Sequence, residues 1–252
     1  MRARSLLLVA LVVLTTPAAA QRRGRRPAGP PRVFLGGDVV FAQPTGDFAD
    51  HVDRAFGGEG HLLYRPSAAS PLALRLDGGY LQYGHESREL PLSSDIGGRI
   101  RVDEVTDNYI AYAGVGPQVG VPDGRLQPYV NASVGVAYFG TDSYLRGTHE
   151  SSEFARTSNF SDTRLAWRAG AGLYVPLTHG RVPVSLDLGA RYHYNGVVDY
   201  LREGGIHDEP DGSISFTPIH GQANFFTFQA GVTVGLRHSR GEHRRGGWGR
   251  RR

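Results

Sequence analysis

Apolar and polar residues alternate with a period of two along most of the chain, and no helix-length stretch has a 3.6-residue period. Alternation of this kind places odd and even positions of a strand on opposite faces. It defines eight segments, at about 33–43, 57–65, 72–84, 105–121, 126–141, 163–177, 182–198 and 223–237. The pattern predicts an all-β protein of eight strands, with a short helix in the loop within residues 47–56.

The connections between these segments alternate in length. The short ones are 66–71, 122–125 and 178–181, and the long ones are 44–56, 85–104, 142–162 and 199–222. In an antiparallel up-and-down sheet every second connection lies at the same end, so one end collects all the short turns. This layout is typical of transmembrane barrels, which have short periplasmic turns and long extracellular loops. An even number of strands also returns both ends of the chain to the periplasmic side.

The alternation alone does not say which face of the strands points inward. The last strand, for example, has one apolar face and one polar face (Phe226, Phe228, Ala230, Val232, Val234 and Leu236 against Thr227, Gln229, Gly231 and Thr233). A soluble lipocalin-like barrel would bury the apolar face. Three features favour the inverted arrangement. The polar faces carry few charges, the strands are long enough to cross a membrane, and aromatic residues stand near strand ends as in interfacial girdles. These aromatic residues are Tyr138, Trp167, Tyr192, Tyr194, Phe226 and Phe228.

The first twenty residues have the pattern of a secretory signal peptide. Arg2 and Arg4 precede a short apolar run, 6–14, and three alanines at 18–20 fit a cleavage site before Gln21. We therefore predict an exported protein with a signal peptide at 1–20 and a barrel domain at 33–237. The chain has no cysteine, which excludes disulfides and thiolate metal sites.

The charge is distributed unevenly, and every basic residue other than histidine is arginine. Residues 22–32 carry five arginines and no acid, and 237–252 carry seven arginines and one acid, whereas 33–236 carry 14 arginines against 23 acidic residues. The sequence pI of about 9.5 therefore reflects the two ends and does not indicate a nucleic-acid-binding domain. We predict a basic disordered leader at 21–32 and a basic disordered tail at 238–252. Alternatively, these ends contact anionic lipid headgroups or cell-wall carboxylates on the periplasmic side.

The signal sequence, the eight segments and the alternating loops together resemble the small outer-membrane β-barrel superfamily of OmpA-, OmpX- and OmpW-like proteins. The stretch from Gly36 to Phe48 (GGDVVFAQPTGDF) is similar to the usual first strand and loop of that group. The resemblance covers about residues 33–237. It implies an eight-stranded barrel in the cell outer membrane, among outer-membrane lipids, inserted by the barrel assembly machinery.

The predicted interior contains ten ionisable residues: Asp38, Glu59, His61, Arg65, Arg75, Asp77, Arg168, Asp187, Arg191 and His193. An eight-stranded barrel is just wide enough to be filled by side chains, and buried charges need partners. One interpretation is a network of ion pairs that fills the barrel. The other is a narrow polar path for ions or small solutes.

Other candidate chemistry in the sequence is weaker. Ser185, Asp187 and His193 have the residue types of a hydrolase triad, but Ser185 and His193 are eight positions apart on one strand, or about 26 Å. The acidic segment 207–212 could bind calcium, although it lacks an EF-hand spacing and is also typical of a solvated loop.

Three functions remain as hypotheses from the sequence. The first is a structural or surface-interaction barrel, since binding residues usually lie on loops. The second is a small porin-like channel, and the third is a membrane-embedded lipid-modifying enzyme. We favour the first and a non-enzymatic protein, and we assign no catalytic, cofactor-binding or metal residue and no cofactor.

Overall fold

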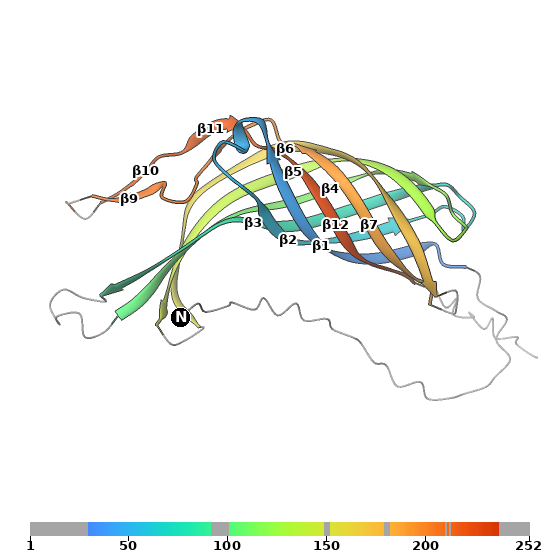
Figure 1. Ribbon diagram of the computed structural model, residues 1–252, viewed down its shortest axis with the longest axis horizontal. Coiled ribbons are helices and arrows are strands. Elements are labelled where there is room, and N and C mark those ends of the chain that lie inside the picture. Colours follow the sequence, from blue (N-terminus) through green and yellow to red (C-terminus); the bar gives the residue numbers. More distant parts are fainter. Residues whose placement is uncertain are drawn as a thin grey trace, which may run out of the picture.

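The computed structural model describes residues 30–91, 101–148, 152–178, 182–209, 211 and 213–236. Within these residues eight antiparallel strands form a closed barrel, in which the first strand also pairs with the last (Figure 1). The strands are β1 (Val33–Thr45), β2 (Ala55–Tyr64), β3 (Leu72–Pro91), β4 (Arg101–Gly120), β5 (Gln127–Gly147), β6 (Glu153–Thr178), β7 (Val184–Tyr194) and β12 (Asn224–Leu236). The predicted eight-stranded up-and-down barrel is confirmed. The predicted signal peptide, most of the basic leader and the basic tail lie outside the described residues.

The apolar faces of the strands point outward. Leu165 is 81% exposed and Val134 is 61% exposed, whereas Arg75 and Arg168 are each 1% exposed. A soluble barrel would show the reverse, because apolar side chains avoid water. The inverted arrangement suits a barrel whose outside is hydrocarbon, and it agrees with the orientation predicted from the sequence.

Aromatic residues form a belt around the outside of the barrel near its long-loop end. The ring centroids of Phe41 and Phe56 are 5.1 Å apart, and those of Tyr80 and Tyr109 are 5.2 Å apart. Further ring contacts continue the belt across β5, β6, β7 and β12. Amphipathic aromatic side chains gather where hydrocarbon meets headgroups. The belt therefore indicates where the outer membrane surface crosses the barrel, and it contains all six aromatic residues predicted for a girdle.

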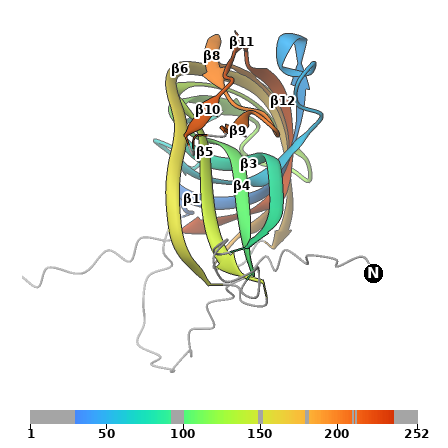
Figure 2. The same ribbon diagram turned by 90° about the vertical axis from the view of Figure 1, so that its left-hand side faces the viewer.

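Four strands continue well past this belt, where the sequence had predicted loops. β3 and β4 pair as far as Pro91 with Arg101, and β5 and β6 pair as far as Arg146 with Glu153. Figures 1 and 2 show these four strands side by side beyond the ends of β2 and β7. We call residues 83–91, 101–108, 141–147 and 153–162 the blade.

Most of the blade was predicted as loop, because charged and polar residues dominate its strands and interrupt the hydrophobic alternation. Cross-strand ion pairs replace apolar contacts there: Arg101 with Glu89 at 2.9 Å, Arg146 with Asp103 at 3.6 Å and Arg156 with Asp142 at 3.7 Å. Opposite charges on neighbouring strands stabilise pairing modestly. Of the predicted loops 85–104 and 142–162, residues 85–91, 101–104, 142–147 and 153–162 are strand.

The first and last long loops fold over the mouth of the barrel. The first holds one 3-10 turn, η1 (Gly46–Phe48), where a helix within 47–56 was predicted. The last holds four short strands in two pairs: β8 (Val197–Tyr200) with β11 (Ile219–Gln222), and β9 (Ile206–Asp208) with β10 (Ile214–Phe216). Gly196 adopts a φ of 67°, which ends β7 before the predicted boundary at 198. The described residues contain no helix of the length and apolarity needed to span a membrane.

The outward position of the apolar faces can be tested with a charge at the middle of a strand. Leu188 lies mid-strand on β7 and is 41% exposed. Leu188→Arg should lower the free energy of unfolding by about 2–4 kcal/mol, because arginine is costly at the bilayer midplane. Leu177→Arg, near the short-turn end of β6, should cost about 0–1 kcal/mol. Urea unfolding in lipid vesicles measures both, and equal effects of the two substitutions would contradict the lipid-facing assignment.

Candidate functional site

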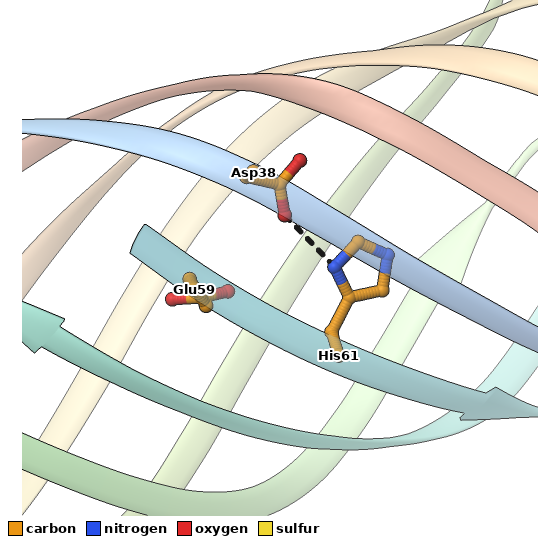
Figure 3. A group of neighbouring side chains, drawn as sticks. All are labelled: Asp38, Glu59 and His61. Atoms are coloured by element: carbon orange, nitrogen blue, oxygen red, sulfur yellow. Dashed lines mark hydrogen bonds and ion pairs between the residues drawn. The ribbon is translucent and has the colours of Figure 1, made fainter. Parts of the chain in front are cut away.

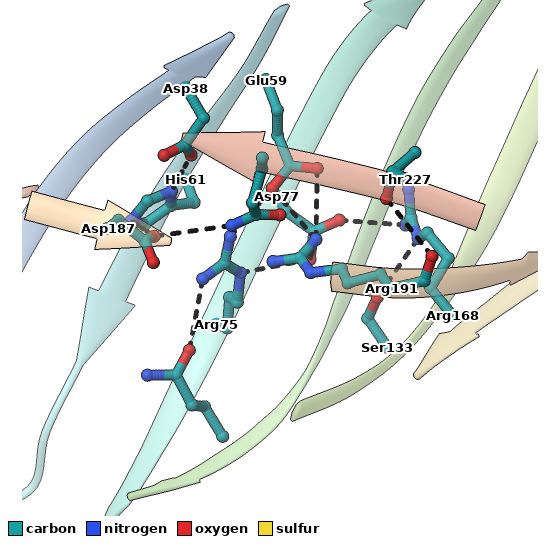
Figure 4. A network of polar contacts seen from close by, with 12 residues as sticks. Asp38, Glu59, His61, Arg75, Asp77, Ser133, Arg168, Asp187, Arg191 and Thr227 are labelled. Carbon is teal, nitrogen blue, oxygen red and sulfur yellow. Dashed lines mark hydrogen bonds and ion pairs between the residues drawn. The ribbon is translucent and has the colours of Figure 1, made fainter. Parts of the chain in front are cut away.

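The middle of the barrel is filled by a network of arginines and carboxylates (Figure 4). Glu59 on β2 accepts from Arg75 on β3 at 2.8 Å and from Arg191 on β7 at 3.0 Å. Asp77 on β3 lies 3.2 Å from the guanidinium of Arg168 on β6. All five side chains are 1% exposed. Because each carboxylate faces at least one guanidinium, the network joins strands from opposite sides of the barrel without leaving an isolated charge.

Neutral polar side chains complete this network. The hydroxyl of Tyr112 donates to Glu59 at 3.0 Å, and Gln118 accepts from Arg75 at 3.2 Å. Arg168 also lies over the ring of Tyr112, 4.9 Å from its centroid. Tyr112 and Gln118 come from β4, and neither was among the residues predicted for the interior. Tyr112, Gly114, Gly116 and Gln118 are alternate residues and share one face of the strand. This run of small and polar residues is the signal that could have identified the inward face.

A second cluster lies beside the first and contains two carboxylates and a histidine. Nδ1 of His61 is 3.0 Å from Asp38, and its Nε2 is 3.0 Å from the hydroxyl of Thr233 and 3.8 Å from Asp187. Asp187 in turn accepts from the hydroxyl of Tyr129 at 2.7 Å. Every side chain of this cluster is buried.

Nine of the ten ionisable residues predicted for the interior are buried there, and the exception is Arg65. Arg65 is half-buried just after β2, with its guanidinium 4.8 Å from the centroid of the Phe34 ring. It follows the last residue of β2 and lies at the short-turn end, so it does not join the network. His193 is buried, with Nε2 3.1 Å from the hydroxyl of Thr227.

A buried apolar cluster that the sequence did not predict occupies part of the long-loop half of the interior, beside buried polar residues such as Asn108 and Thr141. Phe48, from the first loop, packs against Tyr200 from the last loop at 5.1 Å and against Phe139 of β5 at 6.4 Å between ring centroids. We call the buried cluster of which these rings are part the apolar cap: Val40, Ala42, Phe48, Val52, Ala55, Leu81, Ile110, Tyr112, Ala137, Phe139, Ala166, Val198, Tyr200, Ala223 and Phe225. Burial, with Asp47 and Asp50 nearby, raises the pKa of Tyr200 to about 12, so its phenol stays neutral in the cap.

A third layer lies toward the short turns. Tyr129 and Tyr174 stack with ring centroids 4.5 Å apart, and they form a buried cluster with Leu63 and Ala73. The interior thus passes from an apolar cap through paired charges to stacked tyrosines. Side chains fill each of these layers, as expected for a barrel of eight strands.

Asp38, Glu59 and His61 are close enough together to suggest a metal site (Figure 3). Their nearest ligand atoms lie within 4.8 Å of one another. However, Glu59 already accepts from the guanidinium groups of Arg75 and Arg191, which would repel a cation. The arrangement suits internal ion pairing better than metal coordination.

Asp38, His61 and Thr233 also follow the order carboxylate, imidazole and hydroxyl of a hydrolase triad. Thr233 is 4% exposed and His61 is 2% exposed, so the hydroxyl is shielded from any substrate. Two of the three residues considered from the sequence have other partners: Asp187 accepts from the hydroxyl of Tyr129, and His193 lies 3.1 Å from the hydroxyl of Thr227. The geometry therefore supports a structural role for these groups.

The sequence comparison identifies the class. The family model for the outer membrane protein beta-barrel domain matches residues 6–238, and the chain belongs to this family. It is an outer-membrane β-barrel with transmembrane strands. No curated protein sequence matches the chain.

Several solved structures are similar to the chain at low sequence identity. Neisserial surface protein A (NspA) is 15% identical with a TM-score of 0.45, covering 82% of this chain and 99% of its own. Ail, the attachment invasion locus protein of Yersinia pestis, is 12% identical with a TM-score of 0.42, covering 82% and 100%. A major outer membrane protein from Thermus thermophilus is 14% identical with a TM-score of 0.40, covering 81% and 99%.

The energetic importance of the charge network can be tested at Glu59. Glu59→Gln removes the nearest carboxylate of two buried guanidinium groups, Arg75 and Arg191, and it should lower the free energy of unfolding by about 3–5 kcal/mol. Arg156→Gln in the blade removes ion pairs of a side chain that is 54% exposed, and it should cost about 0–1 kcal/mol. Urea unfolding in detergent micelles compares the two. A cost for Glu59→Gln no larger than that of Arg156→Gln would refute the structural role of the network.

Proposed function

We propose that this outer-membrane barrel is a surface-interaction protein, in which a sealed barrel holds the blade outside the membrane to bind extended segments of other proteins. The observation that carries the proposal is the open edge of β6. β6 first pairs with β7 at Trp167, and β8 lies against it near Asp162, whose carboxylate accepts from the N–H of Asp199 at 3.0 Å. Over residues 153–161, no described strand pairs with the side of β6 away from β5. Unpaired N–H and C=O groups along a strand edge can bind a further strand.

The other edge of the blade is partly covered by the last loop. The N–H of His85 on β3 donates to Glu203 at 2.9 Å, and Glu86 on β3 accepts from the N–H of Gly204 at 3.2 Å. By contrast, residues 153–158 of β6 are all exposed. We therefore assign the binding edge to β6 and not to β3.

The filled interior supports this proposal over a channel. Ions would have to pass the aromatic rings of the apolar cap and then a layer in which arginines and carboxylates are paired. A hydrophobic constriction excludes water and ions. We further propose that the protein is not an enzyme and takes no cofactor, because its hydroxyl–imidazole–carboxylate cluster is buried.

The remaining partners follow from the setting. Outer-membrane lipids surround the apolar faces, and the barrel assembly machinery inserts the protein. The arginine-rich ends, which lie almost entirely outside the described residues, would contact anionic cell-wall groups on the periplasmic side. We propose no nucleic-acid partner.

A channel can be distinguished by conductance. Full-length protein reconstituted in planar lipid bilayers should give no discrete conductance steps, because side chains fill its interior. A trimeric porin inserted in the same way serves as the positive control. Reproducible steps from this protein would reject the sealed barrel and favour the small channel.

The blade can be tested by shortening it. Peptides selected from a random displayed library on the detergent-solubilised full-length protein should lose binding when 87–104 and 144–157 are replaced by short turns. They should keep binding when the β9–β10 hairpin, 206–216, is shortened instead. A gel shift on boiling confirms that both variants still form barrels. Peptide binding retained by the shortened blade would overturn the assignment of this edge.

A further inference from the structure

The pairing of β1 with β12 joins the two ends of the barrel sequence and closes the ring. Thirteen residue pairs make this seam, from Val33 with Leu236 to Thr45 with Asn224. A barrel opened here would expose two strand edges to hydrocarbon, which offers no hydrogen-bond partner. Side chains that cross the seam from inside the barrel therefore contribute to closure.

Three residues that lie side by side on β2, β1 and β12 make such a contact across the seam. Gly36 on β1 lies opposite His61 on β2 and also opposite Thr233 on β12. The imidazole of His61 extends over Gly36 and reaches the hydroxyl of Thr233 at 3.0 Å. A Cβ on Gly36 would overlap the Cε1 and Nε2 atoms of the ring. Glycine at position 36 is thus what allows a β2 side chain to cross β1 and contact β12.

The same imidazole contacts charged groups on both sides of the seam. Its Nδ1 is 3.0 Å from Asp38, which is on β1 itself. Its Nε2 is 3.8 Å from Asp187 on β7, which pairs with Gly231 of β12. One buried side chain on β2 therefore contacts groups on β1, β12 and β7.

We propose that His61, seated over Gly36 and bonded to Thr233, is a seam contact that holds β1 and β12 together from inside the barrel. The proposal does not depend on what the blade binds. Two residues of the same types serve as matched controls. His193 is also buried and bonds a threonine, Thr227, but it does so between β7 and β12, which are neighbours, and crosses no strand. Gly37 is next to Gly36, and a Cβ there would meet nothing within 4 Å.

Hydrogen exchange of backbone amides in the full-length protein, in detergent micelles, tests the seam contact. His61→Gln and Gly36→Ala should each speed exchange about tenfold at the β1 and β12 amides of the seam, since each removes a buried polar contact across it. Hydrogen exchange of the backbone amides that pair β4 with β5 should stay at the wild-type rate. Gly37→Ala should leave the exchange rate of the seam amides unchanged. His193→Gln should speed exchange of the amides that pair β7 with β12, but not of those in β1.

Three results would overturn the proposal. The first is that the seam amides of Gly36→Ala exchange at the wild-type rate. The second is an equal increase over all strands in His61→Gln. The third is the same exchange pattern for His61→Gln and His193→Gln. If either seam variant fails to fold, Thr233→Val removes only the hydroxyl that His61 bonds, and it should speed exchange at the seam by a smaller factor. No change in Thr233→Val would then reject the seam contact.

Discussion

The hydrogen-bonding demand of the backbone in hydrocarbon is the constraint on which the rest of the structure depends. Each N–H and C=O inside the membrane needs a partner within the protein, and a closed sheet supplies one to every strand. In this chain closure is made by β1 and β12, whose register extends over the full length of both strands. Because the outer face then meets lipid, the alternating apolar positions point outward and the remaining positions point into a narrow interior.

That narrow interior determines which side chains it can hold. The buried charges of the described interior include four carboxylates (Asp38, Glu59, Asp77 and Asp187) and three guanidinium groups (Arg75, Arg168 and Arg191). At least one of these long side chains, Arg168 of β6, extends over a glycine of another strand. A Cβ on Gly114 would overlap the guanidinium of Arg168, so the inward glycines and the charge network depend on one another. Side chains therefore fill the described interior, and the function proposed above assigns interaction to the blade and loops.

The sequence was sufficient to predict the barrel and its charged interior. Alternation gave the strands, and the strand lengths, the few charges on the polar faces and the aromatic residues near strand ends favoured apolar faces that point outward. Arg75 and Asp77, for instance, are two positions apart and share the inward face of β3. Two features could not be predicted in this way. The blade is stabilised by backbone pairing and cross-strand ion pairs such as Arg101 with Glu89, which leave no apolar signal. The apolar cap depends on Phe48 and Tyr200, which lie in separate loops and meet only when the barrel has formed.

Cross-linking of the first and last strands tests closure of the barrel most directly. The chain has no cysteine, so Val39→Cys with Ala230→Cys places a single pair of thiols on opposing residues of β1 and β12. We expect a short thiol cross-linker, added to isolated outer membranes, to join this pair as efficiently as cysteines at Leu62 and Leu76, which oppose each other on β2 and β3. Efficient cross-linking of the second pair without the first would show that the sheet is open, and it would contradict the closed barrel.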